Sequence, residues 1–356
     1  MSENTRTELS ELGEFGLIKE IQEAVKTKRD DTVKGIGDDA AVIEKNDTHY
    51  SLISTDMLTE GIHFDLTYAP LKHLGYKAVV ANVSDIAAMN GEATHITVSL
   101  GLSNRFSHEA LQELYSGILL ACDVYNVDLI GGDTCASKAG LTISISIYGQ
   151  AKKEDVVYRS GAKENELLVV TGDLGAAFMG LQLLEREKAA FTGDPNVQPD
   201  LEGNDYVLER QLKPEARADV TRFFRELGLK PTSMIDISDG LASEILHLCD
   251  HSELGCSLYE EKIPIDPATF SLAQEFTLDP TVCALSGGED YELLFTVKQS
   301  DFDKIKGSPH FTVIGHMQEK AAGANLVTRD GLLKPLTAQG WDAFLTKERE
   351  EEQKKK

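Results

Sequence analysis

The sequence predicts an α/β (α+β) protein with two domains. A chain of 356 residues is too long for one ordinary core and divides into roughly two domains of about 150 residues each. Strand-like and helix-like segments alternate along it, and turns rich in glycine and aspartate follow several strands, which is typical of mixed α/β folds. The segments 95–102 and 141–148 alternate apolar and polar side chains, as half-buried strands do.

In the first half of the chain, apolar residues at helical spacing predict helices, and short alternating or branched apolar runs predict strands. Helices are expected over residues 8–29, 71–89 and 107–125, and strands over 41–43, 50–55, 95–102, 127–130 and 141–148. The strand over 50–55 is expected to end at Asp56. The strand over 127–130 is expected to run into Gly131, Gly132 and Asp133 at its end.

A boundary near residue 151 separates a predicted N-terminal domain over residues 1–150 from a C-terminal domain over residues 151–345. In the second half, strands are expected over 167–170, 282–285, 291–297 and 311–314, and helices over 174–186, 206–212, 215–227 and 240–250. The polar stretch 187–205 predicts a loop. The charged stretch 346–356 predicts a disordered tail or a frayed helix.

Composition excludes several classes of function. The formal net charge of −24 argues against nucleic acid or an anionic membrane as a partner, because both need clustered Lys and Arg. The sequence contains no run of about 18 apolar residues, the length needed to span a membrane. The N-terminus lacks the apolar core of a secretory signal, so we expect a cytoplasmic protein. The five cysteines include no C-x-x-C pair and are interpreted as reduced thiols, most of them packing residues.

The placement of the aspartates is the most informative feature. Aspartate beside glycine is typical of turns and helix N-caps, and Asp239 can simply cap a helix beginning at Gly240. Asp85 is harder to explain in this way, because a lone carboxylate on an apolar helix face is costly unless it has a partner. Separate segments carry the acids Asp38, Asp39, Asp56, Asp85, Asp133, Asp236 and Asp239.

If these segments converge, each pair of charges at about 5 Å repels by roughly 3 kcal/mol at an effective dielectric near 20. Such a cluster takes up protons or binds cations, and Lys and Arg are scarce near these segments. Carboxylate and hydroxyl oxygens suit Mg²⁺ or Mn²⁺, and Mg²⁺ commonly shares phosphate oxygens. No Walker-type phosphate loop is present. Arg159 is interpreted as a phosphate ligand or as a surface arginine in a turn.

A series of motifs in the same order supports a family assignment. They are Gly13–Ile18, Gly35–Ala41, Ser54–Asp56, Gly61–Phe64, Asn82–Met89, Gly131–Thr134, Arg159–Ala162, Asp236–Gly240 and Ser286–Glu292. Over about residues 10–345 the chain resembles the thiamine-monophosphate kinase family. That family is part of an ATP-binding superfamily that includes aminoimidazole ribonucleotide synthetase and selenophosphate synthetase. The Gly-Glu-Phe start, Gly-x-His-Phe and Gly-Gly-Glu-Asp-Tyr point to the thiamine branch.

The resemblance implies an N-terminal ATP- and metal-binding domain whose sheet pairs with that of a second subunit, and a C-terminal sheet covered by helices. It implies metal ligands at Asp39, Ser54, Thr55, Asp56, Asp85, Asp133, Asp236 and Asp239, although Asp38 and Asp39 are hard to tell apart. It implies nucleotide contacts at Tyr115, Gly132, Asp133, Arg159 and Ser238. It implies substrate contacts at His63, Glu289 and Trp341.

The implied reaction moves the γ-phosphoryl group of ATP onto thiamine monophosphate, with several Mg²⁺ ions as cofactors. The acceptor phosphate is already ionised, since its second pKa is about 6, so no general base is expected. Glu289 could pair with the cationic end of thiamine or could be a solvated turn acid. His63 has a comparable alternative as a buried histidine with ordinary hydrogen bonds.

Two other functions remain open at this point. The first is another ATP-dependent synthetase of the same superfamily. Selenophosphate synthetase, however, would require a reactive Cys or selenocysteine near the N-terminus, and the first cysteine here is Cys122. The second is a regulatory module with calcium sites, but no D-x-[DN]-x-[DN]-G loop with a terminal Glu is present.

Overall fold

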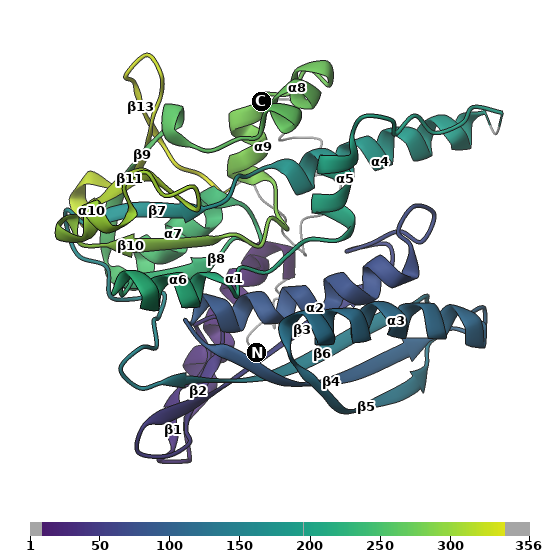
Figure 1. Cartoon of the computed structure of the whole chain (residues 1–356), viewed down its shortest axis with the longest axis horizontal. Helices are drawn as coiled ribbons and strands as arrows, with labels where there is room; N and C mark the ends of the chain where they lie inside the picture. The colour runs from purple at the N-terminus through teal and green to yellow at the C-terminus, as the bar shows by residue number, and fades with distance from the viewer. Residues whose placement is uncertain (1–8, 195, 339–356) are drawn as a thin grey trace, which may run out of the picture.

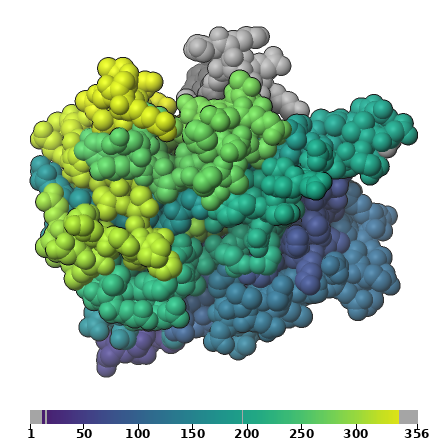
Figure 2. Space-filling view, turned by 45° about the horizontal axis from the view of Figure 1, so that its top comes forward, coloured from purple at the N-terminus to yellow at the C-terminus, as the bar shows by residue number. Residues whose placement is uncertain are grey.

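The chain folds into two mixed β-sheets, each packed against helices. The computed structural model describes residues 9–194 and 196–338, so Trp341 and the predicted tail over 346–356 lie outside the described residues. The N-terminal sheet and its helices form one layer, and the C-terminal sheet and its helices lie over it (Figure 1). The space-filling view shows the same division, with yellow and green C-terminal segments above the blue N-terminal ones (Figure 2). The predicted α/β class is confirmed.

The N-terminal sheet has one buried face. Its strands, in spatial order, are β1 (Thr32–Lys34), β2 (Ala41–Glu44), β3 (His49–Thr59), β6 (Thr142–Lys152), β4 (Glu92–Leu102) and β5 (Asp128–Ala136). Alternate residues such as Val98 and Ile145 pack against the helices α2 (Leu71–Ala88) and α3 (His108–Tyr125). The opposite face carries exposed Met57 and Tyr148. The helix α1 (Leu9–Ala24) precedes this sheet.

Helices α2 and α3 lie side by side over the sheet, and glycines bring their backbones into contact (Figure 1). A Cβ atom at Gly75 would lie 2.1 Å from the carbonyl oxygen of Leu114, and one at Gly117 would lie 1.8 Å from that of Lys72. No larger residue fits at either position. Every residue of α2 from Leu74 to Ser84 is buried, because this helix lies between its own sheet and the C-terminal half.

The C-terminal sheet and its helices pack against the N-terminal half. Its strands, in spatial order, are β13 (Leu333–Pro335), β12 (Ala324–Val327), β9 (Leu254–Tyr259), β11 (Phe311–Glu319), β7 (Leu167–Thr171), β10 (Leu293–Val297) and β8 (Ser233–Asp236). The helices of this half are α4 (Ala176–Gly193), α5 (Asp205–Leu212), α6 (Val220–Leu227), α7 (Leu241–Ser252), α8 (Pro267–Glu275), α9 (Pro280–Ser286) and α10 (Phe302–Ile305). Strand β8 and helix α5 both contact α2. The two halves therefore meet along α2, with further contacts such as the hydrogen bond from Tyr125 of α3 to Glu215 at 2.6 Å.

Several predicted boundaries were wrong. Strand β3 does not end at Asp56, because it pairs with β6 along its whole length, from His49 to Thr59. Strand β5 likewise continues through Asp133, paired in parallel with β4. Helix α4 extends to Gly193, so the predicted loop over 187–205 is helical in its first part.

The predicted strand over 282–285 is also wrong, because these residues belong to helix α9. Asp279 caps that helix by accepting a hydrogen bond from the Thr281 N–H, and Pro280 occupies its first position. A good N-cap followed by proline outweighs the short apolar run. The predicted helices 71–89, 107–125 and 240–250 are confirmed to within about two residues, the usual uncertainty of helix ends.

Two further predictions about composition can be compared with the structure. In the described part of the chain, no helix has the length and hydropathy needed to cross a membrane. All five cysteines are free thiols, four of them buried and Cys135 exposed. The packing role therefore holds for the four buried cysteines but not for Cys135.

Candidate active site

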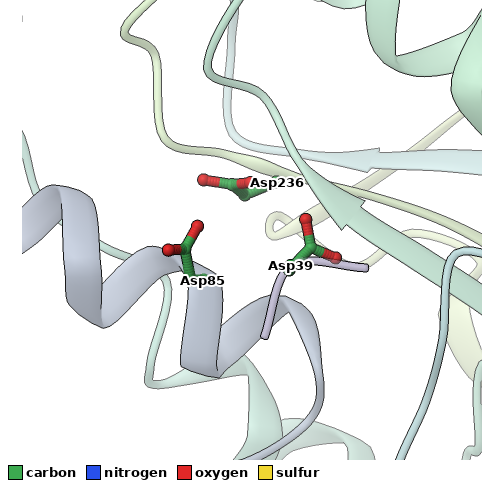
Figure 3. A group of neighbouring side chains, drawn as sticks. All are labelled: Asp39, Asp85 and Asp236. Carbon is green, nitrogen blue, oxygen red and sulfur yellow. The ribbon is translucent and has the colours of Figure 1, made fainter. Parts of the chain in front are cut away.

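Three aspartates from three distant segments converge at the junction of the two halves. Asp39 lies in the turn before β2, Asp85 on α2 and Asp236 at the end of β8. One carboxylate oxygen from each lies within 4.8 Å of the others, and Figure 3 shows the three carboxylates facing a common space. Asp39, and not its neighbour Asp38, belongs to this group. We call these three residues the acid cluster.

Hydroxyl groups hold the acid cluster in place. The Ser54 Oγ donates to Oδ2 of Asp85 at 2.5 Å, and the Ser84 Oγ donates to Oδ2 of Asp236 at 2.6 Å. The side chains of Ser54 and Asp56 lie on the same face of β3, since they are two residues apart. The backbone N–H of Asp56 donates to Oδ1 of Asn82 on α2 at 3.3 Å. Ser54 and Asp56 therefore face the cluster from the sheet.

The carboxylates raise one another's pKa. Burial raises the pKa of Asp85 well above its ordinary value, and the charges of Asp56 and Asp236 raise it further. Burial and the charge of Asp39 raise the pKa of Asp236 to about 7, and burial raises that of Asp56 to about 6. Burial, then the charges of Asp239 and Asp236, raises the pKa of Glu244 on α7 well above its ordinary value. The ionised form of these carboxylates is therefore unfavourable unless a cation or a proton neutralises part of their charge.

We expect the cation-free protein to lose stability as the pH rises from about 4 to about 8. The folded-state pKa values of Asp56 and Asp236, about 6 and about 7, lie above the ordinary value of 3.8. The stability that their protonation contributes is full below about pH 4 and is lost as the pH rises through these values. Thermal melting with EDTA should show this fall. Added Mg²⁺ should raise the melting temperature more at pH 8 than at pH 5.5, and an equal rise at both would contradict the prediction.

Arg159 pairs with the acid cluster. Its Nη2 and Nε lie 2.6 and 3.1 Å from Oδ1 of Asp39, and its backbone N–H donates to Oδ1 of Asp38 at 3.1 Å. The pair is well shielded, since the Asp39 side chain is 0% exposed and that of Arg159 is 22% exposed. This guanidinium supplies the positive charge that the cluster needs when no metal is bound.

The donor set fits a hard divalent cation. Oδ2 of Asp39 is buried and has no hydrogen-bond partner within the described residues. Oδ2 of Asp38 accepts no hydrogen bond there either, but it lies 3.7 Å from Nζ of Lys34. A buried carboxylate oxygen without a partner is unusual, so Oδ2 of Asp39 is available as a metal ligand. The surrounding donors are carboxylate and hydroxyl oxygens, which are the ligands that Mg²⁺ prefers.

Comparison with known proteins agrees with this site. The family model described as AIR synthase related protein, N-terminal domain, matches residues 37–151. The thiamine-monophosphate kinase of Bacillus subtilis (strain 168) is 32% identical over 87% of this chain and 93% of its own length. That of Escherichia coli (strain K12) is 34% identical over 94% of this chain and 99% of its own.

A solved structure of AaThiL complexed with AMPPCP and TMP covers 96% of this chain and 100% of its own, with a TM-score of 0.82 and 31% identity. The chain belongs to the thiamine-monophosphate kinase family. The level of identity, sustained over almost the whole chain, decides this assignment against the synthetases of the same superfamily.

Some residues that the family resemblance assigned to metal or nucleotide are not brought to the acid cluster in a single chain. The Thr55 side chain lies on the opposite face of β3 from Ser54, where its Oγ1 donates to the carbonyl oxygen of Ile145 at 3.0 Å. Gly132 and Asp133 are exposed on β5, which is an edge strand. Tyr115, on α3, packs against the hydrophobic core between the N-terminal sheet and its helices.

The C-terminal residues of the resemblance lie near one another. Ser238 and Asp239 follow β8, and Glu244 accepts from the Asp239 N–H at 3.1 Å and from the Ser238 Oγ at 3.5 Å. The N–H of Glu289 donates to the carbonyl oxygen of Ser238 at 2.7 Å. A backbone hydrogen bond therefore connects the loop of Ser238 and Asp239, assigned to nucleotide and metal, to the turn of Glu289, assigned to substrate.

Sequence reasoning missed Ser84, Asn82 and Glu244. Ser84 and Asn82 precede Asp85 on a helix, so their contacts with β8 and β3 depend on which face meets which strand. Their polarity could have identified them, because these two residues interrupt a buried stretch of helix that is otherwise mostly apolar. For Glu244, the signal was its place in the first turn of the helix after Asp239.

Proposed function

We propose that this protein transfers the γ-phosphoryl group of ATP to thiamine monophosphate, forming thiamine diphosphate and ADP. The observation that carries the proposal is the acid cluster, in a chain that belongs to the thiamine-monophosphate kinase family. AaThiL, the structural relative described above, was solved with AMPPCP and TMP bound. A site built to hold cations beside phosphates is what a transfer between two phosphorylated substrates requires.

The chemistry asks for positioning and charge neutralisation. An acceptor phosphate is ionised near neutral pH because its second pKa is about 6, so it needs no general base. Bound Mg²⁺ would neutralise the phosphates and favour in-line transfer. Asp39, Asp85 and Asp236 would hold the metal, with Ser54, Asp56 and Asp239 beside them. Ser54 and Ser84 would orient the Asp85 and Asp236 carboxylates.

The remaining residues would bind the two substrates. Arg159 would contact nucleotide phosphates once a metal ion takes its place at Asp39, and Ser238 lies in the loop that would face the nucleotide. His63 and Glu289 would bind thiamine monophosphate, and we retain Trp341 in this role. Thr55 and Tyr115 are proposed to contribute as the family resemblance implies.

We also propose a cytoplasmic homodimer with domains over residues 1–150 and 151–345. The open face of the N-terminal sheet carries exposed Met57 and Tyr148, and the edge strand β5 carries exposed Ile130. A second copy covering this face and edge would bury apolar surface and place Gly132 and Asp133 at an interface. Sedimentation at the mass of one chain would contradict the dimer. The free cysteines fit a reducing compartment.

An assay with ATP, Mg²⁺ and thiamine monophosphate tests the proposed reaction. Thiamine diphosphate should appear in equal amount to ADP, detected as its fluorescent oxidised form after separation. Thiamine monophosphate should be required for ADP release above background. ADP release without thiamine diphosphate, in the presence of another acceptor only, would favour a synthetase. Absence of both products would remove the proposal.

A further inference from the structure

Lys77 is a buried lysine at the centre of α2, and the function described so far does not use it. Its side chain is 6% exposed, and its Nζ lies 2.8 Å from Oε2 of Glu289. It also donates to the carbonyl oxygen of Gln211 on α5 at 3.3 Å. A lysine buried to this degree requires compensation by partners, and these partners come from the C-terminal half. Lys77 therefore connects α2 to the turn that carries Glu289.

Glu289 is held by one of its two oxygens. Oε2 accepts from both the Lys77 Nζ and the Gln211 Nε2, the latter at 3.1 Å. Among the described residues, Oε1 has no partner. The backbone of Glu289 is also constrained, with φ of 66° and an N–H bonded to the carbonyl oxygen of Ser238. The carboxylate thus keeps one fixed oxygen and one available oxygen, with a side chain that is 26% exposed.

A small cavity of about 20 Å³ lies beside this ion pair, between α2 and α5. It is lined by His63 as well as by Lys77 and Gln211. His63 is one of the residues that the family resemblance assigns to substrate, and Lys77 and Gln211 are the two residues that hold Glu289. Two buried atoms on its lining residues, Oε1 of Gln211 and Nδ1 of His73, have no hydrogen-bond partner in the described part of the chain. A cavity of this size holds about one water molecule, so these atoms show that its wall is polar beside Lys77 and Gln211.

We propose that Lys77 is a positioning residue of the acceptor site. Together with Gln211 it fixes Oε2 of Glu289, so that Oε1 faces an N–H donor or cationic ring of the acceptor. This inference rests on the proposed function, because it assumes an acceptor that carries a positively charged heterocycle with N–H groups.

Steady-state kinetics with Lys77→Met tests the inference. The KM for thiamine monophosphate should rise about tenfold, the loss expected for one charge-assisted hydrogen bond. The kcat and the KM for ATP should change by less than about twofold, which a general loss of structure would not produce. Lys77→Arg should recover part of the affinity. The matched control is Lys72→Met, an exposed lysine on the same helix, which should leave both constants unchanged.

A double-mutant comparison separates positioning from direct substrate contact. If Lys77 acts through Glu289, adding Lys77→Met to Glu289→Gln should raise the KM by less than about twofold beyond the single Glu289→Gln change. Additive effects would show that Lys77 contacts the acceptor itself and would overturn the inference. So would an unchanged KM in folded Lys77→Met.

If Lys77→Met fails to fold, Gln211→Leu removes the second donor to Oε2. It should raise the same KM with kcat retained, and an unchanged KM there would overturn the inference. If the wild-type protein forms no thiamine diphosphate, both the proposed function and this inference are wrong. Active wild type with unaffected variants removes the inference alone.

Discussion

Asp85→Asn is expected to lower the rate of thiamine diphosphate formation by about 1000-fold or more while leaving the fold intact. Asp85 lies in the acid cluster, and its substitution removes a charged metal ligand from the transfer site. A loss of about 4 kcal/mol of transition-state stabilisation corresponds to a rate change of about 1000-fold. The fold should survive, because the Ser54 Oγ can donate to an amide oxygen as it does to Oδ2 of Asp85.

The same variant should be at least as stable as the parent protein without metal. Burial and neighbouring charges make the ionised form of Asp85 unfavourable, and an amide removes that penalty. Thermal melting in EDTA and kcat with saturating Mg²⁺ measure the two effects. The control is Asp123→Asn, an exposed aspartate on α3, which should change neither. Activity within tenfold of the parent would show that Asp85 does not hold the metal.

Arg159→Ala is expected to destabilise the metal-free protein by about 3–5 kcal/mol, the usual effect of removing one partner of a buried ion pair. The side chain of Asp39 is fully buried and would lose its guanidinium partner beside the carboxylate of Asp236. Chemical denaturation in EDTA measures the loss. Saturating Mg²⁺ should reduce the difference from the parent, since the cation takes over the role of Arg159. The KM for ATP should rise as well.

A matched surface variant makes the Arg159 result interpretable. Arg222 pairs with Glu226 at 3.6 Å, with both side chains more than 60% exposed, so Arg222→Ala should cost about 1 kcal/mol or less. A loss below that level in Arg159→Ala would mean that Asp39 finds another partner. A loss that Mg²⁺ does not reduce would mean that the cation does not bind at Asp39.

Part of the acid cluster could be predicted from the sequence, because Asp85 violates a local rule and the other aspartates recur at the ends of predicted strands and in glycine turns. Asp85 interrupts a helix that is otherwise apolar, and Asp236 and Asp239 flank a short turn after an apolar strand. Helical spacing was strong enough to predict α2, α3 and α7. These features belong to single segments, so periodicity and charge placement detect them.

The missed features depend on contacts between distant segments. The lengths of β3 and β5 are set by the strands beside them, and their own sequences contain turn-forming glycine and aspartate. The partners of Arg159 and Glu289 could not be read from sequence either, because Asp39 and Lys77 lie 120 and 212 residues away in the chain. The resemblance assigned these two residues to external ligands, and the structure shows that each is also paired with a residue of the chain itself.

The contact of glycine backbones between α2 and α3 fixes the position of one member of the acid cluster. With Gly75 and Gly117 each against a carbonyl group of the other helix, the two helices cannot slide or tilt separately without collision. They carry Lys77 and Asp85 as one rigid base with the sheet beneath. An alanine at either glycine would force the two helices apart and would shift Asp85 relative to Asp39 and Asp236 without replacing any residue of the acid cluster.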